Sequence, residues 1–306
     1  MVEQSFLSLF ITFSIIELTN RGSGIIDGLF VSNFLDTDSI ASVGIAKTIY
    51  SVTGILSGLF TVGTQSRCSH ELGKGDIKCF NRIFSSMFYI AAAVSAVCTA
   101  ALLLGASPLA VLMGASGKGA GLADGAALYL RGVGIGFPAL VLTPFVSAAC
   151  NIDSAKARVR KSGIVYFVCN CAFDLIAVKC GFGVFGIGLA TAVGTYMQLA
   201  YLLLHFRTNV RMLRLTKFDI SFCEVKDTLS LGTEKALRSL SKVISPTIVN
   251  RIILLFGGTV AMSAFSVQKD LISFAEIATV GLADATALQA GVYYGEMNRE
   301  TIHAMG

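Results

Sequence analysis

The sequence contains few charged residues. Asp, Glu, Lys and Arg together make up 14% of its 306 residues, whereas hydrophobic residues make up 54%. A soluble domain carries roughly a quarter of charged residues, and a soluble core could not absorb so much apolar surface. The scarcity of charge therefore excludes an ordinary soluble domain and favours a protein whose outer surface faces the lipid bilayer.

The sequence also lacks the motifs of disulfide-rich proteins, metal sites and several enzyme families. Its eight cysteines include no CxxC pair and lie mostly in apolar runs, so they indicate no disulfide framework. Cys68, His70 and Cys79 suggest a metal site, but no further histidine completes four ligands. The motifs HExxH and GxSxG are absent, and GASGKGAG at 114–121 is not a phosphate-binding GxxxxGK[ST] loop. We therefore expect a protein that is not an enzyme, with no cofactor and no nucleic-acid partner.

Eight apolar segments are long enough to cross a membrane. A transmembrane helix needs roughly 20 mostly apolar residues, and none of these segments alternates polar and apolar residues as the strands of a membrane barrel do. An all-α polytopic membrane protein is therefore predicted. The predicted spans lie near residues 5–34, 39–65, 82–104, 123–149, 162–180, 183–206, 228–256 and 259–294.

The basic residues between these spans alternate from one side to the other. If the N-terminus is cytoplasmic, the inward connections hold thirteen basic residues and the outward ones only two, Lys118 and Lys179. This bias follows the positive-inside rule and would collapse if one span were miscounted. It predicts a multi-pass protein of the cell membrane with its N-terminus in the cytoplasm. The inward residues are Arg67, Lys74, Lys78, Arg82, Lys156, Arg158, Arg160, Lys161, Arg207, Arg211, Arg214, Lys217 and Lys226.

A weak internal repeat relates the two ends of the chain. LDTDSIASVGIAKTI at 35–49 aligns with FGGTVAMSAFSVQKD at 256–270, and LGKGD at 72–76 aligns with YGEMN at 294–298. Both windows contain an outward turn, a helix of small residues and an inward glycine turn. Parallel repeats of this kind are a transporter architecture in which the binding site lies between two halves.

The repeat predicts how the chain is organised. We expect an N-terminal six-helix lobe at 1–206, a basic cytoplasmic linker at 207–227, and a partial second lobe of two helices at 228–306. Two complete copies would need about 440 residues, so the predicted architecture is truncated at its C-terminal side.

Polar residues inside the spans indicate a site. Asn170 and Asp174 lie four residues apart, on one face of a helix. A carboxylate at membrane depth costs about 2.5–3.5 kcal/mol, so it normally faces a partner or a cavity. Thr191 in the next span offers a hydroxyl, and Asp27 offers a second carboxyl group. Two carboxylates in a poorly hydrated pocket cannot both ionise at low cost, so such a site takes up H⁺ or Na⁺.

Each of these residues also has a structural interpretation when it is taken alone. Asp174 could end a helix at the membrane surface, and Asp27 could line an aqueous vestibule. Asn170 could join two helices by a hydrogen bond, and Thr191 could simply pack. Two further features read as structural: Glu17 and Arg21 have the spacing of a helical ion pair, while Gly54 and Gly58 indicate close helix packing.

Five ordered segments resemble the multidrug and toxic compound extrusion (MATE) family. They are IIDGLFVSNFLDTDSIASVGIA (25–46), GTQSRCSHELGKGD (63–76), NCAFDLI (170–176), FGIGLATAVGTY (185–196) and LGTEKALRS…LLFGGTVAMSAF (231–265). The resemblance implies twelve helices in two six-helix lobes, which rock between inward-open and outward-open states. It also implies secondary active efflux, by antiport, of small cationic amphipathic drugs in exchange for H⁺ or Na⁺.

The resemblance also implies a set of site residues. Asp27, Asn170, Asp174 and Thr191 match the family's cation site in the first lobe, and Tyr129 matches a nearby tyrosine. Lys242 stands where one branch of the family has a functional glutamate, so the coupling ion is expected in the first lobe. Two alternatives stay open: a flippase of the same superfamily for lipid-linked oligosaccharides, with basic residues lining its cavity, and a membrane fragment that does not transport.

Overall fold

The structure of the chain is a computed structural model, and it describes residues 2–115, 121–207, 212–219 and 222–295. The regular elements in these ranges are helices, and the predicted all-α membrane fold is confirmed. Their bounds are α1 (Val2–Phe34), α2 (Thr37–Ala46), α3 (Thr48–Gly73), α4 (Ile77–Leu104), α5 (Ala106–Leu112), α6 (Leu122–Ile135), α7 (Phe137–Ile152), α8 (Lys156–Lys179), α9 (Gly183–Leu203), η1 (Leu204–Arg207), α10 (Phe222–Ala275) and α11 (Ile277–Gly295).

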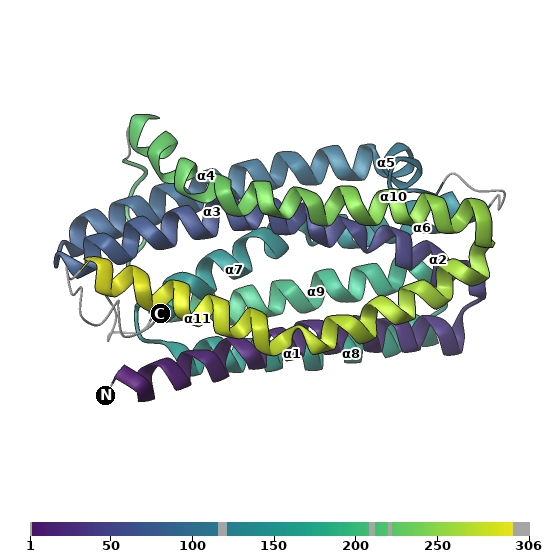
Figure 1. The fold of residues 1–306 in the computed structure, drawn as a ribbon, viewed down its shortest axis with the longest axis horizontal. Coiled ribbons are helices and arrows are strands. Elements are labelled where there is room, and N and C mark those ends of the chain that lie inside the picture. The colour runs from purple at the N-terminus through teal and green to yellow at the C-terminus, as the bar shows by residue number, and fades with distance from the viewer. Residues whose placement is uncertain (1, 116–120, 208–211, 220–221, 296–306) are drawn as a thin grey trace.

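All eight predicted spans coincide with helical segments. By length and composition, five stretches of the described chain can cross a membrane, or six if the pair α6 and α7, bent by 48°, counts as one. Helix α1, which carries Glu17, Arg21 and Asp27, is not among them. One of the five, Ile244–Lys269, contains Gly258, whose φ of 65° lets the chain turn back. Figure 1 shows this turn, so α10 comprises two helices, as predicted.

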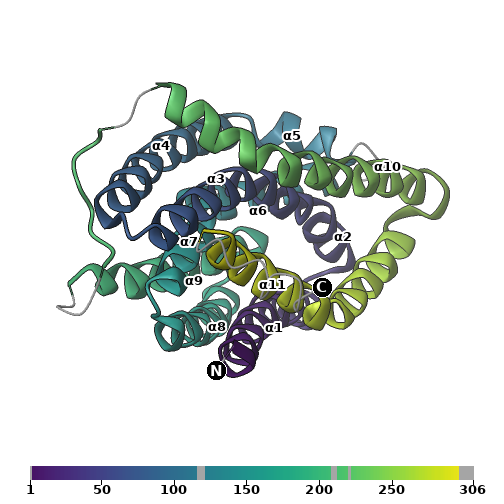
Figure 2. The ribbon, with the colours of Figure 1, turned by 60° about the vertical axis from the view of Figure 1, so that its left-hand side comes forward.

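The long helices lie side by side along the longest axis of the molecule (Figure 1). The predicted first lobe contains α1 to η1, within which α8 packs against α1 and α9, and α9 against α6. Helices α10 and α11 cover it by packing against α3 and α1, as the turned view in Figure 2 shows. The division into two lobes stays a prediction, and α10 begins at Phe222, inside the range assigned to the linker.

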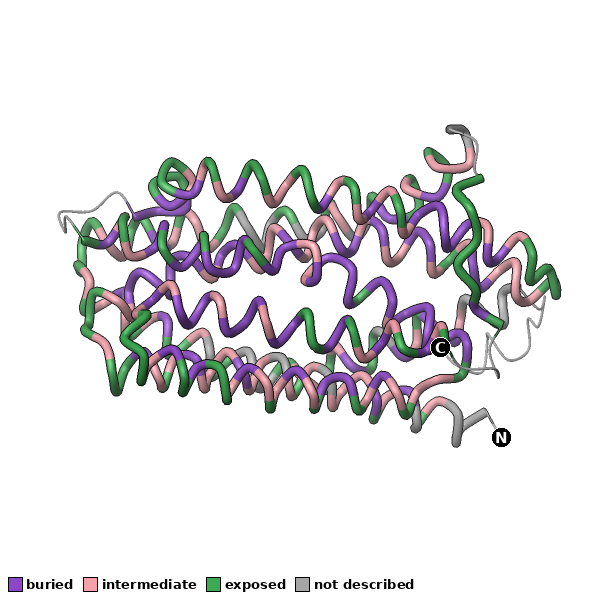
Figure 3. Tube along the Cα trace, turned by 180° about the vertical axis from the view of Figure 1, so that it is seen from behind, coloured by how far each residue is buried: buried purple, intermediate pink, exposed green. Residues whose placement is uncertain are grey.

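Apolar side chains cover much of the outside of the bundle. Buried residues follow the inward faces of the helices and exposed ones the outward faces (Figure 3). Leu104, Leu255 and Phe256 are exposed by 88%, 78% and 89%. Large exposed apolar surfaces mark contact with something other than water, and a lipid bilayer accounts for them here.

Two glycines set the closest approach between α3 and α10. A Cβ atom added at Gly63 would lie 2.0 Å from the carbonyl oxygen of Thr228, and one at Gly232 would lie 2.1 Å from that of Leu59. The two backbones therefore cross in direct contact, which no larger residue permits. The prediction of close packing at Gly54 was wrong, because a Cβ there would meet nothing within 4 Å.

Helix α2 begins at a well-formed cap. The Asp36 carboxylate accepts a hydrogen bond of 2.9 Å from the Ser39 N–H. The hydrogen bonds from Ser39 hold the pKa of the Asp36 carboxyl below its ordinary value of 3.8. Helix α2 is short and stops at Lys47, where the chain bends into α3. This break brings the Lys47 side chain to α1, where its Nζ donates to the Gly24 carbonyl oxygen at 3.1 Å.

The predicted ion pair on α1 is present. Arg21 Nε lies 3.0 Å from Glu17 Oε2, and Arg21 Nη1 also lies 3.3 Å from Glu276 Oε2, which follows α10. These side chains therefore help to hold α1 against the junction between α10 and α11.

Residues 212–219, which lead from η1 towards α10, are bonded to the first turns of α4. The Asn81 amide accepts from the Arg214 N–H at 2.6 Å and donates to the Met212 carbonyl oxygen at 2.9 Å. Ser85 accepts from the Thr216 N–H at 2.8 Å. Next to this segment, Arg82 of α4 pairs with Glu224 of α10 at 2.6 Å. The part of the linker that the structure describes is thus fixed to the first lobe.

Candidate cation site in the first lobe

One face of α8 presents three buried polar side chains. Tyr166, Asn170 and Asp174 follow one another at intervals of four residues, so they lie one turn above the next. Asn170 and Asp174 are 0% exposed, whereas Val168 and Phe173 on other faces of α8 are exposed. The Asp174 carboxyl group therefore lies inside the bundle, five residues before α8 ends at Lys179.

Helix α1 supplies the facing residues. Ser23 and Asp27 lie one turn apart and are both buried. The Ser23 hydroxyl donates to Asn170 Oδ1 and lies 3.2 Å from the Tyr166 hydroxyl. The Asn170 side chain therefore ties α8 to α1, as the structural interpretation proposed, but it does so inside a larger polar cluster.

Helix α9 closes the cluster from a third side. The Thr191 hydroxyl donates to Asp27 Oδ2 at 3.3 Å and lies 3.3 Å from the carbonyl oxygen of Ile187. Gly194, less than one turn later, lets α8 come close. A Cβ atom there would lie 3.2 Å from Asn170 Cβ and 3.3 Å from its backbone nitrogen.

The two carboxyl groups of the cluster face one another. Neither oxygen of Asp174 has a hydrogen-bond donor within reach among the described residues. The group that does interact with it is the Asp27 carboxyl, through charge and through side-chain proximity. Two carboxyl groups hydrogen-bond to each other only when one of them carries a proton. The arrangement therefore calls for a proton or a metal cation between or beside them.

The predicted Tyr129 belongs to the edge of the same cluster. Its hydroxyl lies 2.9 Å from that of Tyr50, and Tyr129 itself is 0% exposed. Tyr50 in turn lies within electrostatic range of Asp27 and Asp174. The structure thus brings together all five predicted site residues, Asp27, Tyr129, Asn170, Asp174 and Thr191.

Three members of the cluster were missed from the sequence: Ser23, Tyr50 and Tyr166. A signal existed for two of them, since Ser23 precedes Asp27 by four residues and Tyr166 precedes Asn170 by four. Tyr50 gave no such signal, because the bend at Lys47 between α2 and α3 determines which way it faces.

The turn between α3 and α4 holds a group of possible metal ligands that shares only Cys79 with the residues considered from the sequence. Glu71, Asp76 and Cys79 place ligand atoms within 4.8 Å of one another. Asp76 is exposed and caps α4 by accepting from the Cys79 N–H, and Glu71 pairs with Lys74 at 3.1 Å. Local structure accounts for these contacts, and we assign no metal to them.

A comparison with models of protein families identifies the family of this chain. The MatE model matches residues 13–176, more than half of the chain, a range that contains both carboxyl groups of the cluster. The chain belongs to the MATE family. Members of this family are transporters and not enzymes, and the predicted family is confirmed.

Solved structures of this family have the same fold. A MATE multidrug transporter, DinF-BH, solved in complex with a ligand, superposes with a TM-score of 0.89 at 19% identity, covering 99% of this chain and 69% of its own. An outward-facing MATE family transporter of the MOP superfamily gives 0.85 at 22% identity, covering 99% and 67%. A MOP superfamily transporter from Pyrococcus furiosus, whose binding pocket is described as reversed in polarity, gives 0.86 at 22% identity, covering 99% and 67%.

These similarities are to the fold, because the identities are low. The chain spans about two thirds of the length of the structures that it matches. No curated protein matches it in sequence.

Proposed function

We propose that the chain carries the ion-coupling site of a secondary active efflux transporter. The observation that supports this most directly is the pair of buried carboxyl groups, Asp27 and Asp174, of which Asp174 has no donor among the described residues. Buried charges are normally paired or bound to a cation. A buried carboxyl group that has no donor and lies beside a second carboxyl group, as Asp174 does among the described residues, is suited to take up a cation and release it again.

The surrounding groups suit either coupling ion. For H⁺, one carboxyl group holds the proton and the other accepts its hydrogen bond. For Na⁺, the carboxylate oxygens, the Asn170 amide oxygen and the Thr191 hydroxyl oxygen supply the hard oxygen ligands that such ions prefer. The tyrosines Tyr50 and Tyr129 close the side of the cluster towards α3 and α6 and limit the entry of water.

Ion binding drives transport only if the ion binds the two arrangements of the lobes with different affinity. The site is formed by α1, α8 and α9, and α1 also contacts α11 of the second lobe. A change in the tilt of α1 thus alters both the carboxyl pair and the contact between lobes. We propose that this link produces alternating access, with the N-terminus on the cytoplasmic side of the cell membrane.

The predicted substrates are cationic amphipathic compounds, and this class follows from the resemblance to the family. A second candidate function is favoured by one observation: Lys47 lines the pocket between α1, α2 and α10. A basic residue lining the cavity was the feature expected of a flippase for lipid-linked oligosaccharides.

The test is a comparison of Asp174→Asn and Asp27→Asn with Asp124→Asn, a substitution of an aspartate in the first turn of α6, outside the carboxyl cluster. Ion-driven efflux is measured in vesicles, for the 306-residue chain beside a chain extended to about 440 residues, the length that two lobes require. We expect both site substitutions to abolish efflux at unchanged protein level, and Asp124→Asn to leave it intact.

Full efflux by Asp174→Asn would refute the role of the site. Efflux by the extended chain alone would show that the shorter chain is the non-transporting fragment considered above. A measurement of ion binding distinguishes a chain that lacks the site from one that has the site but does not transport. Na⁺ or H⁺ bound at the site raises the thermal stability of either chain as the ion concentration rises above its dissociation constant.

A further inference from the structure

One face of α3 is polar along most of the helix. Side chains that can form hydrogen bonds recur there at intervals of three or four residues, the spacing of neighbours on one helical face. Inside a membrane span, polar side chains normally face a partner or a water-filled path. The members of this α3 stripe, which extends over about 27 Å at 1.5 Å per residue, are Tyr50, Thr53, Ser57, Thr61, Thr64 and Cys68.

The α3 stripe connects the carboxyl cluster with the end of α3. At its first residue, the Tyr50 hydroxyl lies 2.9 Å from that of Tyr129, and Tyr50 is within electrostatic range of both carboxyl groups. At its other end, Cys68 lies five residues before α3 ends at Gly73. The basic residues of the turn that follows are expected on the cytoplasmic side. The stripe therefore leads from the candidate cation site towards the predicted cytoplasmic side.

Two threonines of the stripe lack the bond that a helical hydroxyl usually makes. Threonines on other helices donate to the carbonyl oxygen one turn earlier, as Thr99 does at 2.9 Å and Thr195 at 2.7 Å. The hydroxyl oxygens of Thr61 and Thr64 are buried and have no partner among the described residues, and Thr64 is 3% exposed. A buried hydroxyl without a partner is unfavourable, so a molecule that supplies one is stabilised there.

Both threonines line a pocket inside the first lobe. It lies between α3, α4 and α7, has a volume of about 190 Å³ that is partly open, and holds about one ordered water molecule. Thr61, Thr64 and Gln65 supply the two to four polar partners that a buried water requires. The walls on α4 and α7 are apolar and include Phe84 and Phe145, whose ring centroids lie 5.2 Å apart. The pocket therefore suits a water molecule that is bound from the side of α3.

We propose that this pocket binds water and that protons pass through it, along the α3 stripe, between the carboxyl cluster and the cytoplasm. Each water or hydroxyl on the path accepts one proton and releases another, so no group on the path is consumed. The inference rests on the proposed function, in which the cluster takes up and releases an ion. It adds that the ion is H⁺ and that its path lies within the first lobe.

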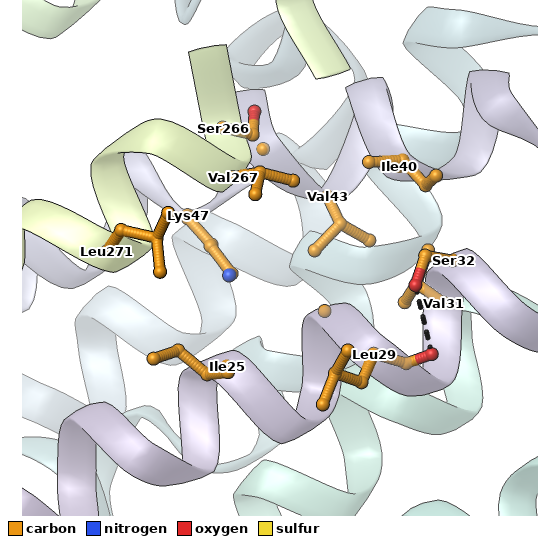
Figure 4. Close-up of a pocket in the computed structure, with 12 residues that line it drawn as sticks. Ile25, Leu29, Val31, Ser32, Ile40, Val43, Lys47, Ser266, Val267 and Leu271 are labelled. Carbon is orange, nitrogen blue, oxygen red and sulfur yellow. Dashed lines mark hydrogen bonds between the residues drawn. The ribbon is translucent and has the colours of Figure 1, made fainter. Parts of the chain in front are cut away.

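The pocket between the predicted lobes is a different space. Figure 4 shows it between α1, α2 and the part of α10 that follows Gly258, with a volume of about 570 Å³ that is also partly open. The two pockets share no lining residue. A path along α3 thus lets a proton leave the cluster without crossing the space between the lobes.

Footprinting with hydroxyl radicals tests whether water reaches the pocket. An X-ray pulse makes these radicals from water, and they oxidise the side chains beside it. The parent chain is irradiated in nanodiscs and three of its thiols are compared: Cys68 lines the pocket, Cys150 is buried but does not line it, and Cys180 is exposed. We expect Cys68 to be oxidised at a rate near that of Cys180, and Cys150 to be protected. Equal protection of Cys68 and Cys150 overturns the proposal.

Infrared spectroscopy tests whether protons follow the stripe. The carbonyl band of a protonated carboxyl group shifts when its proton is exchanged for deuterium, and the band that Asp174→Asn removes belongs to the cluster. After rapid mixing with D₂O, we expect a variant with both Thr61→Val and Thr64→Val to shift this band at least about tenfold more slowly, because the water has lost its partners. Thr64→Ser should keep the parent rate, and so should Thr99→Val, at a hydroxyl bonded within α4.

The outcomes separate this inference from the proposed function. An unchanged exchange rate in a folded variant with Thr61→Val and Thr64→Val overturns the path along α3 and leaves the coupling site in place. If that variant does not fold, the footprint of the parent chain decides. A cluster that Na⁺ stabilises, with no protonated carboxyl band at any pH, also overturns the path alone. Failure of both ions to bind would remove the proposed function as well.

Discussion

Two buried aspartates in this chain have opposite surroundings. Asp153, which follows α7, accepts from the N–H of Met212 at 2.9 Å and of Leu213 at 3.4 Å, and bonds to His205 Nε2 at 2.7 Å. Asp174, at the other end of the next helix, has no donor for either oxygen among the described residues and faces the carboxyl group of Asp27.

The difference separates a structural carboxylate from one that is suited to bind an ion. A buried carboxylate with three donors is stable as an anion, and it holds in place the segments that supply those donors. One without donors destabilises the fold until a proton or cation arrives. Two aspartates that are both buried thus have different roles: Asp153 holds the linker in place, and Asp174 is suited to bind an ion.

The largest effect on the free energy of unfolding is expected from a substitution of Asp153. Asp153→Ala removes the acceptor for two backbone N–H groups and the partner of His205, and breaking a buried pair of this kind costs about 3–5 kcal/mol. We expect this loss in thermal unfolding in detergent, followed by reaction of a thiol dye with the buried Cys68 and Cys150. A loss below about 1 kcal/mol, the value of one ordinary hydrogen bond, would show that Asp153 does not hold the linker.

Asp174→Asn should act in the opposite direction. The amide is neutral and can donate to Asp27, so we expect the unliganded protein to gain about 1–2 kcal/mol from the removal of an uncompensated buried charge. The extra stability that Na⁺ or low pH gives the parent chain should disappear. The same dye assay in NaCl and in choline chloride measures both effects, and a loss of stability would contradict the contrast with Asp153.

Gly194→Ala should disturb the candidate cation site without replacing either of its carboxyl groups. The added methyl group would lie 3.2–3.3 Å from Asn170 and Tyr166, and overpacking costs about 1–3 kcal/mol. Ion-linked stabilisation should fall as well, because Asn170 shifts. Gly54→Ala is the matched control, since a Cβ there meets nothing within 4 Å. Equal behaviour of the two variants would show that the spacing of α8 and α9 does not matter to the site.

The smallest effect concerns the exposed Asp36. Asp36→Ala removes the cap of α2 and should cost about 1 kcal/mol. Because Ser39 holds the pKa of this carboxyl below 3.8, the cap stabilises the folded chain above that pH, and the contribution is lost as the pH falls through the lowered value. The stability difference between parent and variant should therefore shrink only in strongly acidic solution. A difference that persists there would assign it to another cause.

The sequence predicted the parts of the molecule that depend on local pattern. Apolar length located the eight helical spans, and the four-residue spacing of Asn170 and Asp174 placed both on the buried face of α8. The sequence pattern alone did not predict which helices contact one another. Asp27, Tyr129 and Thr191 were assigned to the site through the family resemblance, and the structure shows the helix contacts that bring them together.

Contacts made by the backbone were not predicted. Asn81, Ser85 and Asp153 bind the linker through its N–H and carbonyl groups, which nearly every residue possesses, so no pattern in residues 212–219 signals the interaction. The small residues gave a wrong prediction for a related reason. Gly54 has the spacing of a packing motif, but an added Cβ there would meet nothing within 4 Å, whereas Gly63 lies where α3 crosses α10. A glycine permits close approach but does not specify a partner.

The bonded linker constrains how the second lobe can move. Asn81 and Ser85 bind residues 212–219, and Arg82 pairs with Glu224, so the beginning of α10 is fixed to α4 and would serve as the pivot of such a movement. The part of α10 before Gly258 is about 54 Å long at 1.5 Å per residue, so a tilt of about 10° displaces its far end by about 9 Å. The segment of α10 that follows Gly258 forms one wall of the pocket beside Lys47, so a rotation at the linker would also move that wall.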